Sequence, residues 1–139
     1  MHKELTMTSS ARWTLAIVSV ALFMTTLDNL VVSNALPSIR DGLGASVESL
    51  QWTVNAYTLT FAVLLLTGAA LGDRFGRRRM FITGLVVFTV ASALAALAPS
   101  IGALVAARAI QGAGAAMVLP LTLTLLSEAV ASERRGLAL

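Results

Sequence analysis

Apolar residues are distributed along the chain in four long segments that short polar clusters separate. A helix needs about 20 mostly apolar residues to cross the hydrocarbon core of a bilayer. Four segments meet this requirement, and they run from about Trp13 to Leu36, Leu50 to Gly72, Met80 to Ala98 and Ile101 to Ser127. The pattern therefore predicts an all-α membrane protein with four transmembrane helices.

The residues at the segment boundaries support this division. Pro37 is expected to close the first segment, and Pro99 and Ser100 separate the third from the fourth. Trp13 and Trp52 stand where interfacial aromatic side chains are common. β-Strands are disfavoured, because the segments are long, rich in Ala and Leu, and without sustained alternation.

Two features of the segments leave an alternative open. Pro120 lies inside the fourth segment and predicts either a kink or the end of its regular helix. The first segment follows Lys3 and Arg12, as the apolar part of a signal peptide would. Its apolar run is longer than a typical signal sequence, and three further spans follow it, so we interpret it as a membrane helix.

Composition excludes several classes of protein. The 139 residues are 57% hydrophobic and 12% charged, with a mean hydropathy of +0.83, whereas soluble domains carry about 25% charged residues. A soluble domain and a disordered chain are both excluded on this ground. Cysteine is absent and His2 is the one histidine, so we expect no metal site, no cofactor and no enzyme active site.

Basic residues set the expected orientation in the membrane. The net charge is +3, and the bases cluster beside apolar runs, which favours a membrane topology signal over nucleic-acid binding. One side of the membrane receives eight of them: Lys3, Arg12, Arg74, Arg77, Arg78, Arg79, Arg134 and Arg135. The opposite side receives Arg40. We predict that both termini of this segment are cytoplasmic and that residues 37–49 lie outside.

Asp28 and Arg108 are the two charged residues inside the predicted spans. An ionisable side chain costs several kcal/mol to insert, so each is a candidate for function. At a rise of about 1.5 Å per residue, both lie roughly 10–12 Å below the outer membrane surface. Opposite charges at similar depth predict contact in the outer half of the membrane.

Other polar residues fall near the same depth. Gln51, Asn55 and Thr58 form one stripe on the second span, and Gln111 lies one turn from Arg108. Together they predict a wet polar cavity in which a carboxylate takes up and releases a proton. The alternative is an ion pair that only fixes the packing of the helices.

Small residues mark the expected contacts between helices. Gly68 and Gly72 form a GxxxG pattern on the second span, and Gly112 and Gly114 lie in a small-residue stretch of the fourth. Such residues let two helix backbones approach closely in a membrane, which can be ordinary packing without a further role.

Three stretches resemble the major facilitator superfamily, and specifically its fourteen-helix drug:proton antiporter branch. Residues 27–37 read LDNLVVSNALP and resemble that branch's first-helix motif, L-D-x-T-x-V-N-x-A-L-P. Leu30 and Ser33 depart from it. Residues 108–116 read RAIQGAGAA and match the fourth-helix motif R-x-x-Q-G-x-G-A-A at its defining positions. The resemblance implies that Arg108 takes part in proton transfer near Asp28.

The third stretch lies between the second and third spans. Residues 69–79 read AALGDRFGRRR and resemble the superfamily's signature loop, G-x-L-A-D-R-x-G-R-R-R, with Ala69 in place of the first Gly. The resemblance implies a conformational latch that comprises Gly72, Asp73, Arg74, Gly76, Arg77, Arg78 and Arg79. A plain positive-inside loop would explain the arginines but not Asp73 and Gly76.

The resemblance covers about residues 13–135 and implies the first part of an N-terminal six-helix bundle. We expect a fragment of a transporter, to be completed by further helices of the same protein, in a bacterial cell membrane. Its expected function is proton-driven efflux of hydrophobic or cationic compounds, with Asp28, Arg108, Gln111, Asn55 and Gln51 along the path. The alternative is a truncated four-helix interaction protein that does not transport, which an efflux assay on this chain alone would reveal.

The expected orientation can be tested by labelling single cysteines in this cysteine-free chain. A membrane-impermeant maleimide applied to intact cells should label Ser46→Cys and spare Arg78→Cys, because eight of nine loop and tail bases favour the cytoplasm. Permeabilised cells provide the control, since both positions should then react. Labelling of position 78 alone in intact cells would show that the topology is the reverse of the predicted one.

Overall fold

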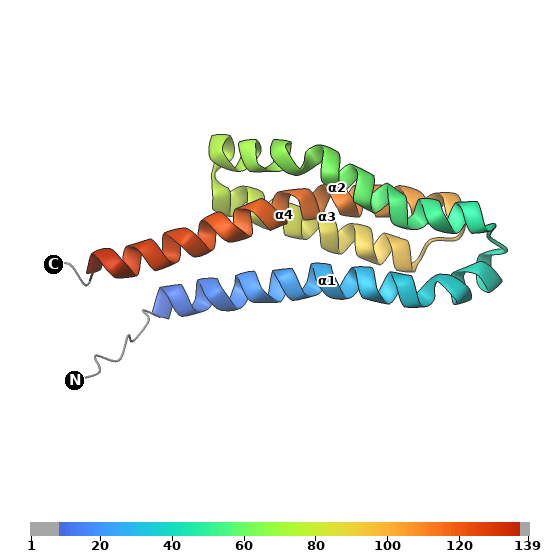
Figure 1. Ribbon diagram of the computed structural model, residues 1–139, viewed down its shortest axis with the longest axis horizontal. Coiled ribbons are helices and arrows are strands. Elements are labelled where there is room, and N and C mark those ends of the chain that lie inside the picture. Colours follow the sequence, from blue (N-terminus) through green and yellow to red (C-terminus); the bar gives the residue numbers. More distant parts are fainter. Residues whose placement is uncertain (1–8, 137–139) are drawn as a thin grey trace.

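The computed structural model describes residues 9–136, with side chains as far as residue 129. It consists of four consecutive helices: α1 (Ser9–Leu43), α2 (Val47–Phe75), α3 (Arg77–Ala96) and α4 (Ile101–Gly136). The helices run up and down beside one another, and the start of α1 and the end of α4 lie at the same end of the bundle (Figure 1). His2, Lys3 and the side chains of Arg134 and Arg135 lie outside the described residues.

All four helices are long and apolar enough to cross a membrane, as the sequence predicted. One prediction about prolines was wrong, since Pro37 does not close the first helix and α1 continues to Leu43. Of the two outcomes predicted for Pro120, the structure contradicts the helix end, because α4 runs to Gly136. Proline removes one backbone hydrogen bond, but a membrane helix tolerates this loss where water or a neighbouring helix satisfies the freed carbonyl.

Helix α4 is the centre of the bundle. In its most apolar stretch 44% of the residues are buried, against 17–22% in the other three helices. It packs mainly against α2 and α3, whereas α1 makes a smaller contact with it and touches α2 only slightly. Two buried clusters lie along α4, one with Phe81, Val118 and Leu121, the other with Phe88 and Ala115.

Glycines allow α4 to approach its neighbours at backbone distance. A Cβ on Gly68 of α2 would overlap the carbonyl of Ala116, and a Cβ on Gly112 would overlap the carbonyl of Tyr57. On the other side, a Cβ on Gly114 would come within 2.7 Å of the Phe88 nitrogen. The three small residues predicted at helix contacts therefore lie where any larger side chain would separate the helices.

A single residue, Gly76, connects α2 to α3. Its φ of 98° lies in the left-handed region that favours glycine, and its N–H donates to the Gly72 carbonyl at 3.0 Å. Its carbonyl accepts from the N–H of Met80, also at 3.0 Å, so the turn closes one helix and opens the next. The signature loop of the sequence is thus a tight reversal that places Asp73 and Arg77 side by side.

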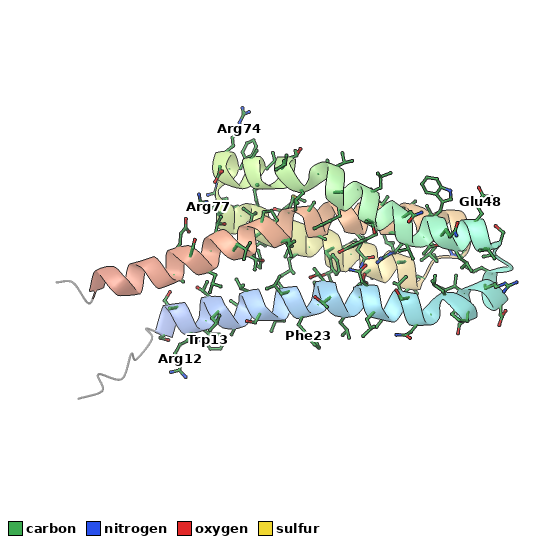
Figure 2. All side chains as sticks on the ribbon, viewed as in Figure 1. Arg12, Trp13, Phe23, Glu48, Arg74 and Arg77 are labelled. Atoms are coloured by element: carbon green, nitrogen blue, oxygen red, sulfur yellow. The ribbon has the colours of Figure 1, made fainter. Side chains whose placement is uncertain are left out.

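Large apolar side chains cover the outside of the bundle. Figure 2 shows Trp13 and Phe23 pointing away from the other helices, and both side chains are about two-thirds exposed. Hydroxyl groups on these faces bond to their own helix, as Thr58 does to the Val54 carbonyl at 3.2 Å. These faces are therefore compatible with lipid, and the ion pairs of the described residues lie in two clusters.

Candidate functional site

Arg108 is the most deeply buried charge among the described residues and organises the first polar cluster. It lies on the buried side of α4, where its side chain is 1% exposed. Its Nη1 donates to Asp28 Oδ2 at 2.5 Å and to Gln111 Oε1 at 2.8 Å. The contact between Asp28 and Arg108, which their similar depth in the sequence predicted, is therefore present in the structure.

Asp28 receives a second hydrogen bond at its other oxygen. Gln111 Nε2 donates to Asp28 Oδ1 at 2.6 Å, while Gln111 Oε1 accepts from Arg108. The Asp28 side chain is 13% exposed, so both partners of the ion pair are largely removed from solvent. The amide of Gln111 thus closes a ring of three side chains in which both carboxylate oxygens are satisfied.

The guanidinium of Arg108 has further partners on α1 and α2. Its Nη2 donates to Asn29 Oδ1 at 3.3 Å, and its Nε donates to the Thr53 carbonyl at 3.4 Å. Its Cζ lies 4.5 Å from the centroid of the Tyr57 ring, which is a cation–π contact. Helices α1, α2 and α4 therefore meet at one side chain.

The balance of charge and burial explains why this cluster can exist inside a membrane. A buried charge costs several kcal/mol unless an opposite charge and hydrogen bonds compensate for it. Here Asp28 and Arg108 cancel, and no buried side-chain nitrogen or oxygen among the described residues lacks a partner. The cluster is therefore neutral as a whole.

The polar stripe predicted on α2 does not join this cluster. Gln51, Asn55 and Thr58 are exposed, and within residues 9–129 neither amide has a hydrogen bond to Asp28 or Arg108. The face of α2 that meets Arg108 carries Thr53 and Tyr57 instead. Sequence reasoning missed these two, although Tyr57 is the single tyrosine of the chain and lies one turn from Thr53.

Cavities adjoin the cluster on both sides. A space of about 400 Å³ between α1, α3 and α4 has Asp28 and Gln111 in its wall and is otherwise lined mainly by apolar residues. A smaller one of about 200 Å³ lies between α1, α2 and α4 and includes Asn29 and Tyr57. The bundle is therefore hollowed next to Asp28, and the larger cavity is more apolar than the sequence suggested.

A second cluster lies at the end of the bundle where α2 turns into α3. Arg77 donates to Asp73 Oδ1 from Nε at 3.1 Å and from Nη2 at 3.0 Å, and its Nη1 pairs with Glu128 of α4 at 2.5 Å. The sequence does not indicate this pairing, because 51 positions separate Glu128 from Arg77. One arginine therefore links the ends of α2, α3 and α4.

The other residues of the signature loop take different positions. Arg74, Arg78 and Arg79 are exposed, and the Arg74 guanidinium lies 5.4 Å from the ring centroid of Phe75. Gly72 is buried against the side chain of Leu121 on α4. Across the described part of the chain, no three acidic or histidine side chains gather in a way that would hold a metal ion.

Comparison with known proteins identifies a single family. The model of the Major Facilitator Superfamily matches residues 18–139. Over 128 residues the chain is 48% identical to a cephamycin export protein of Amycolatopsis lactamdurans. This match covers 92% of this chain and 26% of the relative. The chain is also 45% identical over 115 residues to a puromycin resistance protein of Streptomyces alboniger, a match that covers 83% of this chain and 23% of that relative.

A third relative comes from a different bacterial genus. The chain is 42% identical over 120 residues to a methylenomycin A resistance protein of Bacillus subtilis, covering 86% of this chain and 26% of that protein. The chain thus spans about a quarter of the length of the curated relatives it matches.

The geometry of the first cluster predicts strong coupling between Asp28 and Arg108. Asp28→Asn or Arg108→Gln alone should lower the free energy of unfolding in detergent by about 3–5 kcal/mol, because each leaves a buried charge unpaired. The double variant should lose less than the sum of the two. Arg40→Gln, an exposed arginine on α1, should change stability by less than about 0.5 kcal/mol. Additive losses in the double variant would show that the two charges are compensated independently.

Proposed function

The chain belongs to the Major Facilitator Superfamily, and from this premise we propose that it serves proton-coupled efflux of hydrophobic or cationic small molecules such as antibiotics. The superfamily consists of membrane transporters rather than enzymes, and the relatives include drug and antibiotic efflux proteins. The direction of transport and the class of compound are inferred from those relatives. The compound, the protons, the lipid bilayer and the remaining helices of a transporter are the proposed partners of this segment.

The observation that carries the proton coupling is the set of partners around Asp28. Protonation of Asp28 would remove its negative charge and weaken its bond to Arg108. Arg108 would then keep Gln111 Oε1, Asn29 Oδ1 and the Thr53 carbonyl as acceptors. Arg108 therefore stays hydrogen-bonded when a proton binds at Asp28, although its positive charge is then unpaired.

The roles follow from these contacts. Asp28 is the group that carries the proton, and Arg108 determines when it is charged. Gln111 holds both partners in register through its two amide atoms. Gln51 and Asn55, which are exposed on α2, are proposed to line the wider substrate path rather than the coupling site.

This assignment can be tested in a chimera in which the chain replaces its matching segment of the Bacillus subtilis relative. In everted vesicles, a pH gradient should drive uptake of methylenomycin A by the chimera, and Asp28→Asn should reduce this uptake to the background of empty vesicles. Asp41→Asn is the matched control, because Asp41 is an exposed acid on the same helix. Uphill uptake by Asp28→Asn would show that Asp28 is structural and that coupling occurs in helices beyond this segment.

The same chimera separates the proposed function from its alternative. Transport by the chimera and none by the chain alone would show that the segment works within a larger transporter. A chimera that inserts correctly but never transports would favour the non-transporting interaction protein.

We also propose that the Asp73–Arg77–Glu128 cluster is a conformational latch with its arginines at the cytoplasmic surface. Its side chains are 37–66% exposed, so water competes with each ion pair, which can break and re-form readily. The turn at Gly76 holds Asp73 and Arg77 on adjacent helix ends. A contact that is weak but well oriented suits a step that opens and closes during each transport cycle.

Asp73→Asn in the chimera should therefore slow turnover several-fold while the equilibrium affinity for the compound stays the same. Binding and initial transport rate should be measured on the same vesicles, with Glu48→Gln, an acid at the other end of α2, as the control. A large loss of affinity at unchanged turnover would instead place Asp73 in the binding site.

A further inference from the structure

The smaller cavity beside the ion pair has a wall of aromatic rings. It measures about 200 Å³ and lies between α1, α2 and α4, with Thr25 and Asn29 on α1, Tyr57 and Phe61 on α2, and Ala115 and Leu119 on α4 among its lining residues. An apolar cavity of about 150 Å³ accepts benzene, whereas complete ligand sites measure about 300–1,000 Å³. The cavity is therefore large enough for one or two rings of a larger compound.

The two aromatic residues form a parallel pair of rings. Tyr57 and Phe61 are one turn apart on α2, and their rings are parallel within 2° with centroids 6.2 Å apart. Parallel, offset rings are a favourable arrangement, and a further planar ring can extend it. Ala115 of α4 contributes only a methyl group to the wall and leaves room for such a ring.

The charges near the cavity are already compensated. None of its lining residues carries a charged side chain, and the adjacent Asp28 and Arg108 pair with each other. The Thr25 hydroxyl donates to the Leu22 carbonyl at 2.9 Å, so its oxygen is left to accept a hydrogen bond. The cavity thus favours planar shape and hydrogen-bond donors over net charge.

Tyr57 connects this cavity to the proton-carrying cluster. The Arg108 guanidinium lies over its ring, and the ring of Phe61 is stacked parallel to it. A compound that packs on Phe61 therefore contacts the residue that holds Arg108 beside Asp28. Occupancy of the cavity and the position of Arg108 are linked through Tyr57, and also through Asn29, which lines the cavity and accepts a hydrogen bond from Arg108.

We propose that this cavity is a subsite for the planar aromatic part of the transported compound, with Phe61 as the contact surface and Tyr57 as the positioning residue for Arg108. The identity of the bound compound as cargo rests on the proposed function, but binding itself does not. The subsite thus selects planar ring systems that carry amino or hydroxyl donors over non-planar ions of equal charge.

Two monovalent cations test the shape preference at constant charge. Ethidium is planar and carries amino groups, whereas tetraphenylphosphonium is not planar and has no hydrogen-bond donor. Binding of each to the purified chain in phosphatidylcholine nanodiscs is measured by equilibrium dialysis, with empty nanodiscs subtracted. Phe61→Ala should weaken ethidium binding about three- to tenfold, the range expected for loss of one aromatic contact, and should leave tetraphenylphosphonium unchanged.

Two further variants separate ring stacking from general apolar contact. Phe61→Leu keeps apolar volume but removes the ring, so it should also weaken ethidium binding. Leu59→Ala alters an exposed residue on the same helix and should have no effect. Equal losses for both compounds, an effect of Leu59→Ala, or ethidium binding no better than to empty nanodiscs would overturn the proposal.

The role of Tyr57 needs a readout besides affinity. In the chimera, Tyr57→Leu should shift the pH dependence of transport, while Phe61→Ala should lower the ethidium to tetraphenylphosphonium ratio and leave that pH dependence unchanged. An unchanged pH dependence of transport in Tyr57→Leu would show that Tyr57 does not position Arg108. Failure of the chimera to transport, with selective ethidium binding intact in nanodiscs, would overturn the proposed function and not the subsite.

Discussion

The position of Arg108 depends on compensation of its charge. A guanidinium that is 1% exposed within a membrane bundle must have its charge balanced where it lies. Asp28 supplies that charge from α1, and Gln111, Asn29 and the Thr53 carbonyl satisfy the remaining donors. Helix α1 packs less extensively than α2 and α3 against α4, so this cluster is the most specific connection between α1 and the rest of the bundle. Under the proposed proton coupling, a change in the charge of Asp28 would act on the contact that connects α1 to α4.

The two polar clusters divide their tasks by burial. The Asp28 cluster is enclosed, so its interactions are strong and its geometry is fixed by three helices. The Arg77 cluster is exposed, so water competes with it and its ion pairs are weak. Between them, α4 carries a member of each: Arg108 near one end of the bundle and Glu128 near the other. Under the proposed function, α4 would connect a change at the enclosed contact to the exposed one.

Much of this architecture could be predicted from the sequence, and the exceptions have physical causes. The four helices follow from hydropathy alone, and the contact between Asp28 and Arg108 follows from their depth. The rotation of α2 could not be predicted, because a lipid-facing helix is apolar on several sides and its polar residues do not mark the buried face. Tyr57 and Thr53 therefore take the inner position that Gln51 and Asn55 were expected to occupy. The pairing of Arg77 with Glu128 depends on how α3 and α4 pack, which a local pattern does not contain.

The contact between Gly68 and Ala116 has a consequence for how this protein can diverge. In a regular helix the Ala116 carbonyl would accept from the N–H of residue 120, which is Pro120 and has none. That carbonyl instead faces Gly68, whose missing Cβ leaves room for it. The contact between the two helices at this point thus depends on both the proline of α4 and the glycine of α2. It is a joint between backbone atoms, and a smaller side chain at Gly68 is not possible. Sequence drift can proceed gradually on the lipid-facing surfaces, but at this joint it has to proceed by paired replacements.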